Sequence, residues 1–323
     1  MPSSRTTSAY TPLQLPPRAM LSALWRVKSL MTDNYANMVA ASIAFYGLLA
    51  IFPAIAALIS IWGLVSDPLE VQQQIQAMNG IVPQEAVSII SQQAIKVSTN
   101  PQAGMSVTAI GGLLFTLYSA SKGVRGFMAG LNIIYGEQEH RGLIHQALIN
   151  VTLTLGLVLS TIITLAAIAL VPAIIGYLPF GDLLSSIMLY ARWPLMLMLV
   201  LFAIALLYRF APDRRAARWQ WLTPGALAAT LLWLLGSAGF SIYVRNFSSY
   251  NETYGSIGAV VILLMWFWLS AYIVLLGAGI NREFERETST DTTVGAERPM
   301  GDRKAYAADT TASQDAAEKS SAG

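Results

Sequence analysis

The stretch Met38–Val65, MVAASIAFYGLLAIFPAIAALISIWGLV, contains no charged residue. It is longer than the about 20 apolar residues that a helix needs to cross the hydrocarbon core of a bilayer. A buried helix of a soluble protein is normally shorter and carries polar residues on one face. Further apolar runs follow at residues 105–121, 143–175, 193–208, 222–244 and 257–280. The sequence therefore predicts an all-α, polytopic membrane protein with six transmembrane helices.

The composition agrees with this fold class. Hydrophobic residues make up 54% of the chain and charged residues 12%, against about 25% charged in an average soluble domain. The mean hydropathy is +0.52. A net charge of +2 gives no reason to expect a nucleic-acid partner, and the absence of cysteine excludes disulfides and thiol chemistry. Residues 1–37 lack the apolar core of a cleavable signal peptide, so Met38–Val65 is expected to be an uncleaved first span.

The basic residues between the runs predict the orientation. Thirteen lie in the N-terminal segment, in the second and fourth connections and directly after the sixth run, against three in the other connections. Because Lys and Arg concentrate on the cytoplasmic side, both termini are expected in the cytoplasm of a bacterial inner membrane. The thirteen are Arg5, Arg18, Arg26, Lys28, Lys122, Arg125, Arg141, Arg209, Arg214, Arg215, Arg218, Arg282 and Arg286, and the three are Lys96, Arg192 and Arg245.

Three segments outside the spans are distinct. Residues 1–37 form a polar cytoplasmic N-terminal segment before the membrane domain of residues 38–286. The connection 67–101 contains two short amphipathic patterns, which predict either a solvated hairpin or an extracytoplasmic helical cap between spans one and two. Residues 288–323 are rich in Thr, Ser, Ala and acids with few large apolar side chains, and they are predicted to be a disordered cytoplasmic tail.

The sequence lacks the usual groups for catalysis. His140 and His145 are five residues apart and cannot share one helical face as in HExxH. No phosphate-binding loop, nucleophile elbow or cluster of carboxylates within a span is present. We therefore expect no catalytic residue, no metal site, no cofactor and no enzymatic activity.

Polar residues near membrane depth are the candidate substrate pathway. Lys122 and Arg125 either extend from the cytoplasmic end of the second span or point together into a cavity that attracts an anion. Asn150 and Thr154 in the third span either pack through hydroxyl-to-carbonyl bonds or form a polar stripe facing a cavity. The turn between the last two spans adds Arg245, Asn251, Glu252, Tyr254, Gly255 and Ser256. Arg245 is expected to pair there with Glu252 or with an anionic head group.

Several segments resemble one bacterial family. Asn246–Val260, which reads NFSSYNETYGSIGAV, is similar to a signature of the YihY/BrkB family of inner-membrane proteins. Further similar segments are ASIAFYG at 41–47, YRFAPDRR at 208–215 and LTPGA at 222–226, so the resemblance covers about residues 24–285. It implies a six-helix membrane fold and carries an old label, ribonuclease BN, that is widely regarded as a misassignment. Family members often have an acid where this chain has Gly279, and Glu283 lies four residues later.

These observations favour a transporter or flippase-like protein for a lipid or an amphipathic anion, with membrane lipids as partners. The alternative is a non-catalytic structural or assembly factor of the envelope. A ribonuclease or another hydrolase is the least favoured class. The number of spans also has an alternative, in which residues 105–134 form a re-entrant segment and the chain crosses five times.

Overall fold

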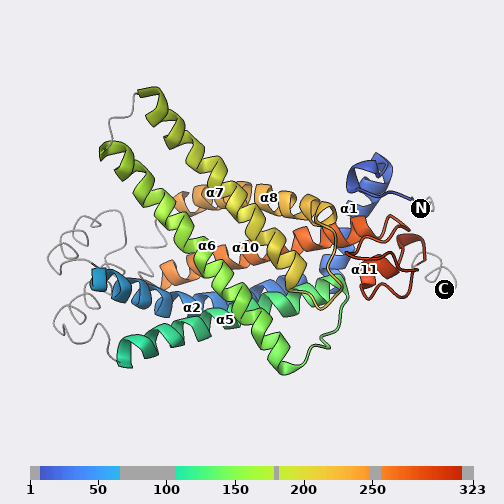
Figure 1. Cartoon of the computed structure of the whole chain (residues 1–323), viewed down its shortest axis with the longest axis horizontal. Coiled ribbons are helices and arrows are strands. Elements are labelled where there is room, and N and C mark those ends of the chain that lie inside the picture. The colour runs from blue at the N-terminus through green and yellow to red at the C-terminus, as the bar shows by residue number, and fades with distance from the viewer. Residues whose placement is uncertain (1–7, 66–106, 178–181, 247–255, 315–323) are drawn as a thin grey trace. The chain divides into compact units, whose positions relative to one another are not determined.

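The computed structural model describes residues 8–65, 107–177, 182–246 and 256–314, and its regular elements there are all helices. Six are long and are shown in Figure 1: α2 (Ala36–Val65), α5 (Val107–Tyr135), α6 (Leu143–Tyr177), α7 (Asp182–Phe210), α8 (Trp219–Asn246) and α10 (Ser256–Glu285). Shorter ones are η1 (Pro12–Gln14), α1 (Pro17–Asp33) and α11 (Tyr306–Asp309). One isolated antiparallel bridge joins Ala217 and Thr293. The all-α prediction is confirmed.

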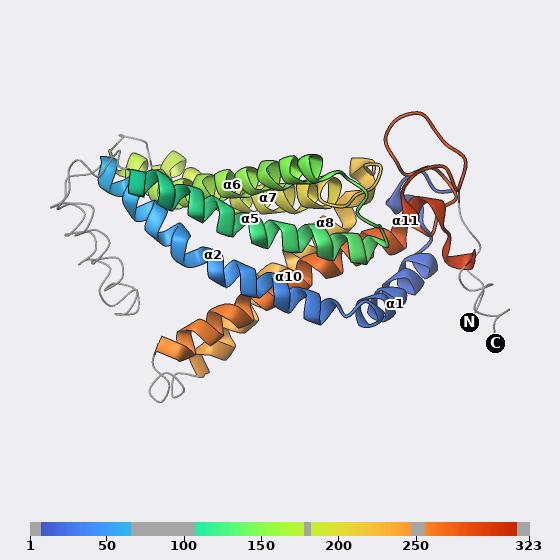
Figure 2. The same cartoon turned by 90° about the horizontal axis from the view of Figure 1, so that it is seen from below.

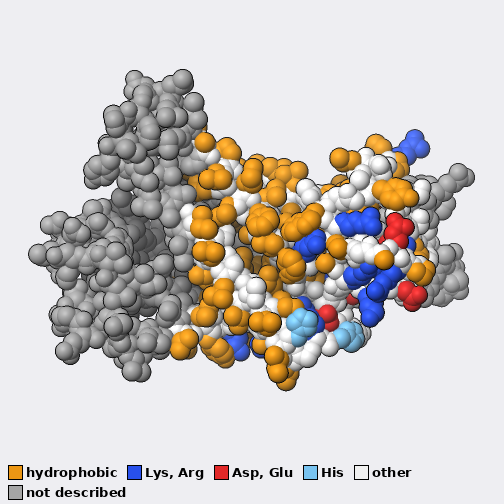
Figure 3. All heavy atoms as spheres, in the orientation of Figure 1, with side chains coloured by type: hydrophobic (Ala, Val, Ile, Leu, Met, Phe, Trp, Pro, Cys, Tyr) orange, Lys and Arg blue, Asp and Glu red, His pale blue; other side chains and the backbone are white. Residues whose placement is uncertain are grey.

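Four helices contain windows that are long and apolar enough to cross a membrane: Leu143–Ser160, Trp193–Phe210, Trp219–Val244 and Val260–Glu285. At most 28% of any of these windows is buried within the protein, so most of their apolar side chains face outward, as lipid-facing side chains do. Figure 3 shows hydrophobic side chains over the described face of α6 and α7. Six spans and the placement of both termini in the cytoplasm remain predictions.

The chain divides into two compact units. The first contains residues 1–41, 127–241 and 268–323, and the second contains residues 42–126 and 242–267. In the second unit a Cβ added at Gly126 would lie 3.2 Å from Ile43 Cγ1, and one added at Gly123 would lie 3.9 Å from Gly47 N. Glycines on α5 therefore let it pack closely against α2, as small residues do between membrane helices.

In the first unit, α8 and α10 meet almost backbone to backbone. A Cβ at Gly225 would collide with the Gly277 carbonyl oxygen, so only glycine fits this crossing. Asn281 secures the contact, because its Oδ1 accepts from Gly225 N at 2.7 Å and its Nδ2 donates to Leu222 O at 3.1 Å. Tyr208 of α7 donates to Val274 O of α10 at 2.6 Å. These bonds satisfy polar groups that would be costly unpaired in an apolar setting.

The amphipathic helix α1 covers the other side of α10. It buries Ala19, Ala23, Val27, Leu30 and Met31, which recur at helical spacing. A Cβ at Gly279 would lie 3.4 Å from Leu30 and from Val27. The position where family members often carry an acid therefore packs in this chain against the apolar face of α1.

Residues 288–314 follow a defined path in the structure, where the sequence predicts a disordered tail. This segment folds back beside α1 and the end of α10 (Figure 2). Several of its alanines are buried, and polar bonds also hold it: Arg303 donates to the carbonyls of Ser289, Thr290, Arg298 and Ala308. Composition indicates disorder because it measures apolar surface, and this segment is ordered instead by hydrogen bonds to its own and neighbouring backbone.

Other boundaries also differ from the sequence prediction. Helix α5 continues without a break through Lys122 and Arg125 to Tyr135, so the run 105–121 is only its first part. Helix α7 begins at Asp182, eleven residues before the predicted span at 193. The predicted cap at 67–101 lies outside the described residues.

Candidate functional site

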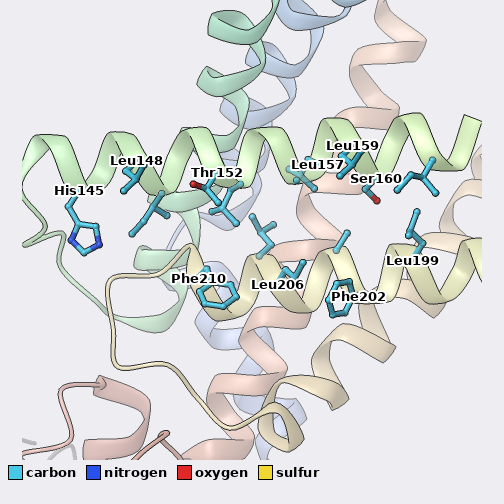
Figure 4. Close-up of a pocket in the computed structure, with 16 residues that line it drawn as sticks. His145, Leu148, Thr152, Leu157, Leu159, Ser160, Leu199, Phe202, Leu206 and Phe210 are labelled. Carbon is cyan, nitrogen blue, oxygen red and sulfur yellow. The ribbon is translucent and has the colours of Figure 1, made fainter.

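A groove lies between α6 and α7, the two neighbouring helices that run antiparallel in Figure 1. Its volume is about 540 Å³, which falls within the range of small-molecule binding sites. It extends along α6 from His145 to Ile163, which is about 27 Å at the rise of an α-helix. Figure 4 shows its walls, formed by His145, Leu148, Ile149, Thr152, Leu153, Gly156, Leu157, Leu159, Ser160 and Ile163 of α6 and Leu199, Phe202, Ala203, Leu206, Leu207 and Phe210 of α7.

The groove is apolar and open at the surface. Its polar side chains are one imidazole and two hydroxyls, those of His145, Thr152 and Ser160. Leu148 and Phe202 expose 65% and 53% of their surface although they line it. A length close to the about 30 Å hydrocarbon core, with apolar walls open to the side, suits an alkyl chain that enters from the bilayer.

Aromatic side chains and one arginine follow α7 from Phe202 to the end of the groove formed by His145 and Phe210 (Figure 4). The ring of Phe202 stacks on Trp219, with centroids 6.3 Å apart and an interplanar angle of 17°. The Arg209 guanidinium carbon lies 4.5 Å from the Trp219 ring centroid and 5.7 Å from that of Phe210. Tryptophan is common where a membrane helix reaches the head-group level, so this arrangement indicates the interfacial end of the groove.

Beyond the ends of the long helices lies a buried ionic cluster, which we define as Arg26, Arg214, Glu283, Glu285, Arg286 and Glu287. Arg26 of α1 donates from Nε to Glu283 Oε2 at 2.8 Å and also bonds Glu287. Arg286 Nη1 lies 3.3 Å from Glu283 Oε1. Arg282 Nε also lies 3.9 Å from Glu283 Oε1, so each carboxylate of the cluster has at least one arginine partner where water is excluded.

Arg214 and Glu285 form the most deeply buried pair of this cluster. Their side chains are 2% and 0% exposed, and two bonds of 2.6 and 3.3 Å join them. The Arg214 guanidinium also lies over the Tyr135 ring at 4.8 Å. Burial opposes the charge of Arg214, yet the neighbouring Glu285 carboxylate raises the Arg214 pKa above its ordinary value. Burial also raises the pKa of Tyr135, so both groups keep their usual charge states.

The folded C-terminal segment closes over this cluster. The Tyr306 ring lies 5.0 Å from the Arg282 guanidinium carbon and 5.8 Å from that of Arg286. Tyr306 N donates to Glu137 Oε1 at 2.8 Å. Burial raises the pKa of Glu137 above its ordinary value, although the nearby Arg214 opposes the shift. Arg282 Nε and Tyr135 Oη have no hydrogen-bond partner among the described residues. Every carboxylate of the cluster is paired with an arginine, which suits a structural role for the cluster better than a ligand site.

The candidate pathway residues do not converge on one described site. Asn150 and Thr154 are buried away from the groove, and Thr154 Oγ1 donates to Asn150 O at 2.7 Å, the packing arrangement considered above. Asn150 Oδ1 has no hydrogen-bond partner within the described part of the chain. Lys122 and Arg125 belong to the second unit, where Lys122 Nζ lies 4.9 Å from the Tyr118 ring centroid and Arg125 is exposed.

The predicted turn between the last two spans is largely outside the described residues. Arg245 lies in the last turn of α8 and Ser256 is the first residue of α10. Asn251, Glu252, Tyr254 and Gly255 are not described, so the expected pairing of Arg245 stays a prediction. Within the described ranges no group of three or more His, Cys, Asp or Glu side chains is placed to hold a metal ion.

Comparison with known proteins decides the family. The sequence profile of the family described as virulence factor BrkB matches residues 27–300. The chain belongs to the BrkB family. It is an integral membrane protein, as the apolar helices and the names of its relatives both indicate. No solved structure matches the chain.

Three relatives illustrate the range of BrkB-family proteins. The chain is 28% identical over 269 residues to YfkH of Bacillus subtilis, named a ribonuclease-like protein, covering 81% of this chain and 94% of YfkH. It is 29% identical over 256 residues to a UPF0761 membrane protein of Vibrio parahaemolyticus, covering 78% of each. A UPF0761 membrane protein of Nitrosospira multiformis is 30% identical over 258 residues, which are 76% of this chain and 56% of that longer protein.

The sequence prediction missed both the groove and the aromatic end near Arg209. Arg209 entered the argument only as a marker of orientation, although it directly follows an apolar run and precedes Trp219 by ten residues. The sequence prediction assigned no role to Gly156 or to the leucines around it. The available signal was a cation at the end of one span and a tryptophan at the start of the next.

Proposed function

We propose that this BrkB-family protein is a transporter or flippase-like protein of the bacterial inner membrane, acting on a lipid or an amphipathic anion. The observation that carries the proposal is the groove between α6 and α7. It is apolar, nearly as long as the hydrocarbon core is thick, and open along its side. A groove of this kind fits an alkyl chain that moves laterally out of the bilayer.

The lining of the groove favours binding and movement over hydrolysis. It carries one imidazole, two hydroxyls and no carboxylate. His145 and Ser160 are fifteen residues apart on α6, which separates them by about 22 Å along the helix. A nucleophile and its base must lie within hydrogen-bond reach of one another. We therefore propose a non-enzymatic role, in which the ribonuclease-like name of a relative does not describe the chemistry of this groove.

The proposed orientation follows the basic residues. With both termini in the cytoplasm, the end of the groove at His145 and Phe210 opens at the cytoplasmic leaflet. The neighbouring basic residues Arg141 and Arg214 then lie on the side where positive charge concentrates. A lipid would enter with its head group at that end and its chain along α6.

A lipid-translocation assay tests this proposal. Purified protein would be reconstituted into liposomes carrying a fluorescent phospholipid, and the rate at which the probe changes leaflets would be measured by chemical quenching. We expect wild-type protein to accelerate translocation above protein-free liposomes. A wild-type protein that leaves the rate unchanged, in both membrane orientations, would contradict the proposal.

Two glycine variants connect the activity to the groove. A Cβ added at Gly156 meets nothing within 4 Å, and Gly156 lines the groove, so Gly156→Trp would place an indole in it. Gly239 of α8 is a matched control, because a Cβ there is equally unobstructed and Gly239 does not line the groove. We expect Gly156→Trp to lower the rate strongly and Gly239→Trp to leave it near wild type.

A further inference from the structure

Arg209 is a cation at the end of an apolar span, and its only hydrogen bond among the described residues is to a backbone carbonyl. It is half-buried, and its Nη1 donates to Ala217 O at 2.9 Å. No carboxylate of the described residues lies within ion-pair distance of it, whereas Arg26, Arg141 and Arg214 each have at least one. A guanidinium has five N–H donors, so four remain for a ligand. An unpaired cation at the edge of the hydrocarbon region is costly and is normally paired.

The surroundings of Arg209 hold its guanidinium in a defined orientation. The Trp219 ring supports it at 4.5 Å and the Phe210 ring lies at 5.7 Å. A guanidinium stacked on an aromatic face loses little freedom when it binds an anion, and its planar fork matches phosphate oxygens in pairs. The same side chain would bind a rounded ammonium poorly, because like charges repel. The arrangement therefore selects a phosphate in a head group of net negative charge.

Arg209 also adjoins the groove. Phe210 lines the groove and contacts the guanidinium, while Phe202 lines it and stacks on the supporting Trp219. Arg209 is seven residues after Phe202, which places it about 20° away around the helix, at the edge of the lining face. His145 stands on the opposite wall at the same end (Figure 4) and offers a further N–H donor.

We infer that the groove holds an anionic membrane phospholipid, whose phosphate binds Arg209 and His145 and whose acyl chain lies between α6 and α7. This inference rests on the proposed function for the nature of the occupant, and it adds the class of head group and the residues that recognise it. A zwitterionic lipid such as phosphatidylcholine would fill the apolar groove but bring a trimethylammonium to the arginine. Phosphatidylglycerol has a net negative charge and would bring no cation to the arginine.

Equilibrium binding to detergent-purified protein tests this inference, with labelled phosphatidylglycerol and phosphatidylcholine as probes. We expect wild-type protein to bind phosphatidylglycerol about tenfold more tightly, because phosphatidylcholine brings a trimethylammonium toward the Arg209 guanidinium and like charges repel. Arg209→Gln should remove this preference. Arg218→Gln is the matched control, because Arg218 lies in the same connection and its Nε likewise donates to a backbone carbonyl, that of Thr293. It should leave the preference intact.

Two further variants separate the parts of the site. Arg209→Lys keeps the charge but loses the paired geometry, so phosphatidylglycerol binding should weaken several-fold; this variant decides the question if Arg209→Gln does not fold. Gly156→Trp should weaken the binding of both lipids. Equal affinity of wild-type protein for the two lipids, or an undiminished preference in a folded Arg209 variant, would overturn the inference. Selective binding without translocation would refute the proposed function and leave this inference standing.

Discussion

Replacing Glu285 with glutamine should destabilise the protein more than any other single isosteric change in the ionic cluster. The Glu285 side chain is 0% exposed, its two oxygens accept from Arg214 at 2.6 and 3.3 Å, and Thr292 Oγ1 donates to it at 3.0 Å. Removing its charge leaves Arg214, itself 2% exposed, as a buried cation without its ion-pair partner. Breaking one side of such a pair costs about 3–5 kcal/mol.

The assay is reversible unfolding in mixed micelles, followed by the fluorescence of the eight tryptophans. A matched control is Glu297→Gln, which removes the same charge from an exposed carboxylate of the C-terminal segment and should change the free energy of unfolding by less than about 0.5 kcal/mol. The double variant Arg214→Met, Glu285→Leu should have a free energy of unfolding closer to that of wild type than Glu285→Gln has, because two apolar groups replace both charges. A Glu285→Gln variant as stable as the control would refute the account of the cluster.

Three further outcomes are expected in the same assay. Gly277→Ala should cost about 1–3 kcal/mol, because its Cβ would overlap α8, whereas Gly239→Ala, in open space, should stabilise slightly. Because the folded-state pKa of Glu137 is raised, its ionisation opposes folding as pH rises above about 4.5. The free energy of unfolding of Glu137→Gln should therefore equal that of wild type at pH 4 and exceed it at pH 7. The glutamine can still accept the hydrogen bond from Tyr306 N. Removing residues 289–323 should lower stability, and an unchanged midpoint would show that the folded segment contributes nothing.

The long helices were predictable because a transmembrane helix is encoded locally. Each apolar run coincides with a helix, and Leu143 and Trp219 begin helices at or within three residues of the predicted starts. The run ending at Ser121 was predicted too short, since Lys122 and Arg125 looked like a boundary. Two basic side chains do not stop a helix whose backbone bonds continue, and α5 extends to Tyr135.

The ionic cluster could not be predicted, because its partners are distant in sequence. Arg26 and Glu283 are 257 residues apart, and a single sequence contains no signal that pairs them. The run Asn281–Glu287 reads as a solvated helix end, yet each of its residues is buried. The order of residues 288–314 has the same origin, since it depends on carbonyls and carboxylates supplied by other segments.

The groove was hidden for a different reason. Helix α6 is apolar around most of its circumference, so periodicity distinguishes no face, and a groove arises only from how α6 packs on α7. Asn150 and Thr154 attracted attention because polar residues are rare in a span, but they face inward and bond within the helix. Arg209 and Trp219 were visible in the sequence, and their meaning depended on the two phenylalanines that connect them to the groove.

The most direct test of the central claim is a cryo-electron microscopy map of the wild-type protein in nanodiscs that contain phosphatidylglycerol. We predict elongated density between α6 and α7, running from His145 toward Ile163, with a head group in contact with the Arg209 guanidinium. The map of Gly156→Trp should lack that density while the helices keep their positions. A wild-type map in which side chains or another helix fill the groove would contradict the account.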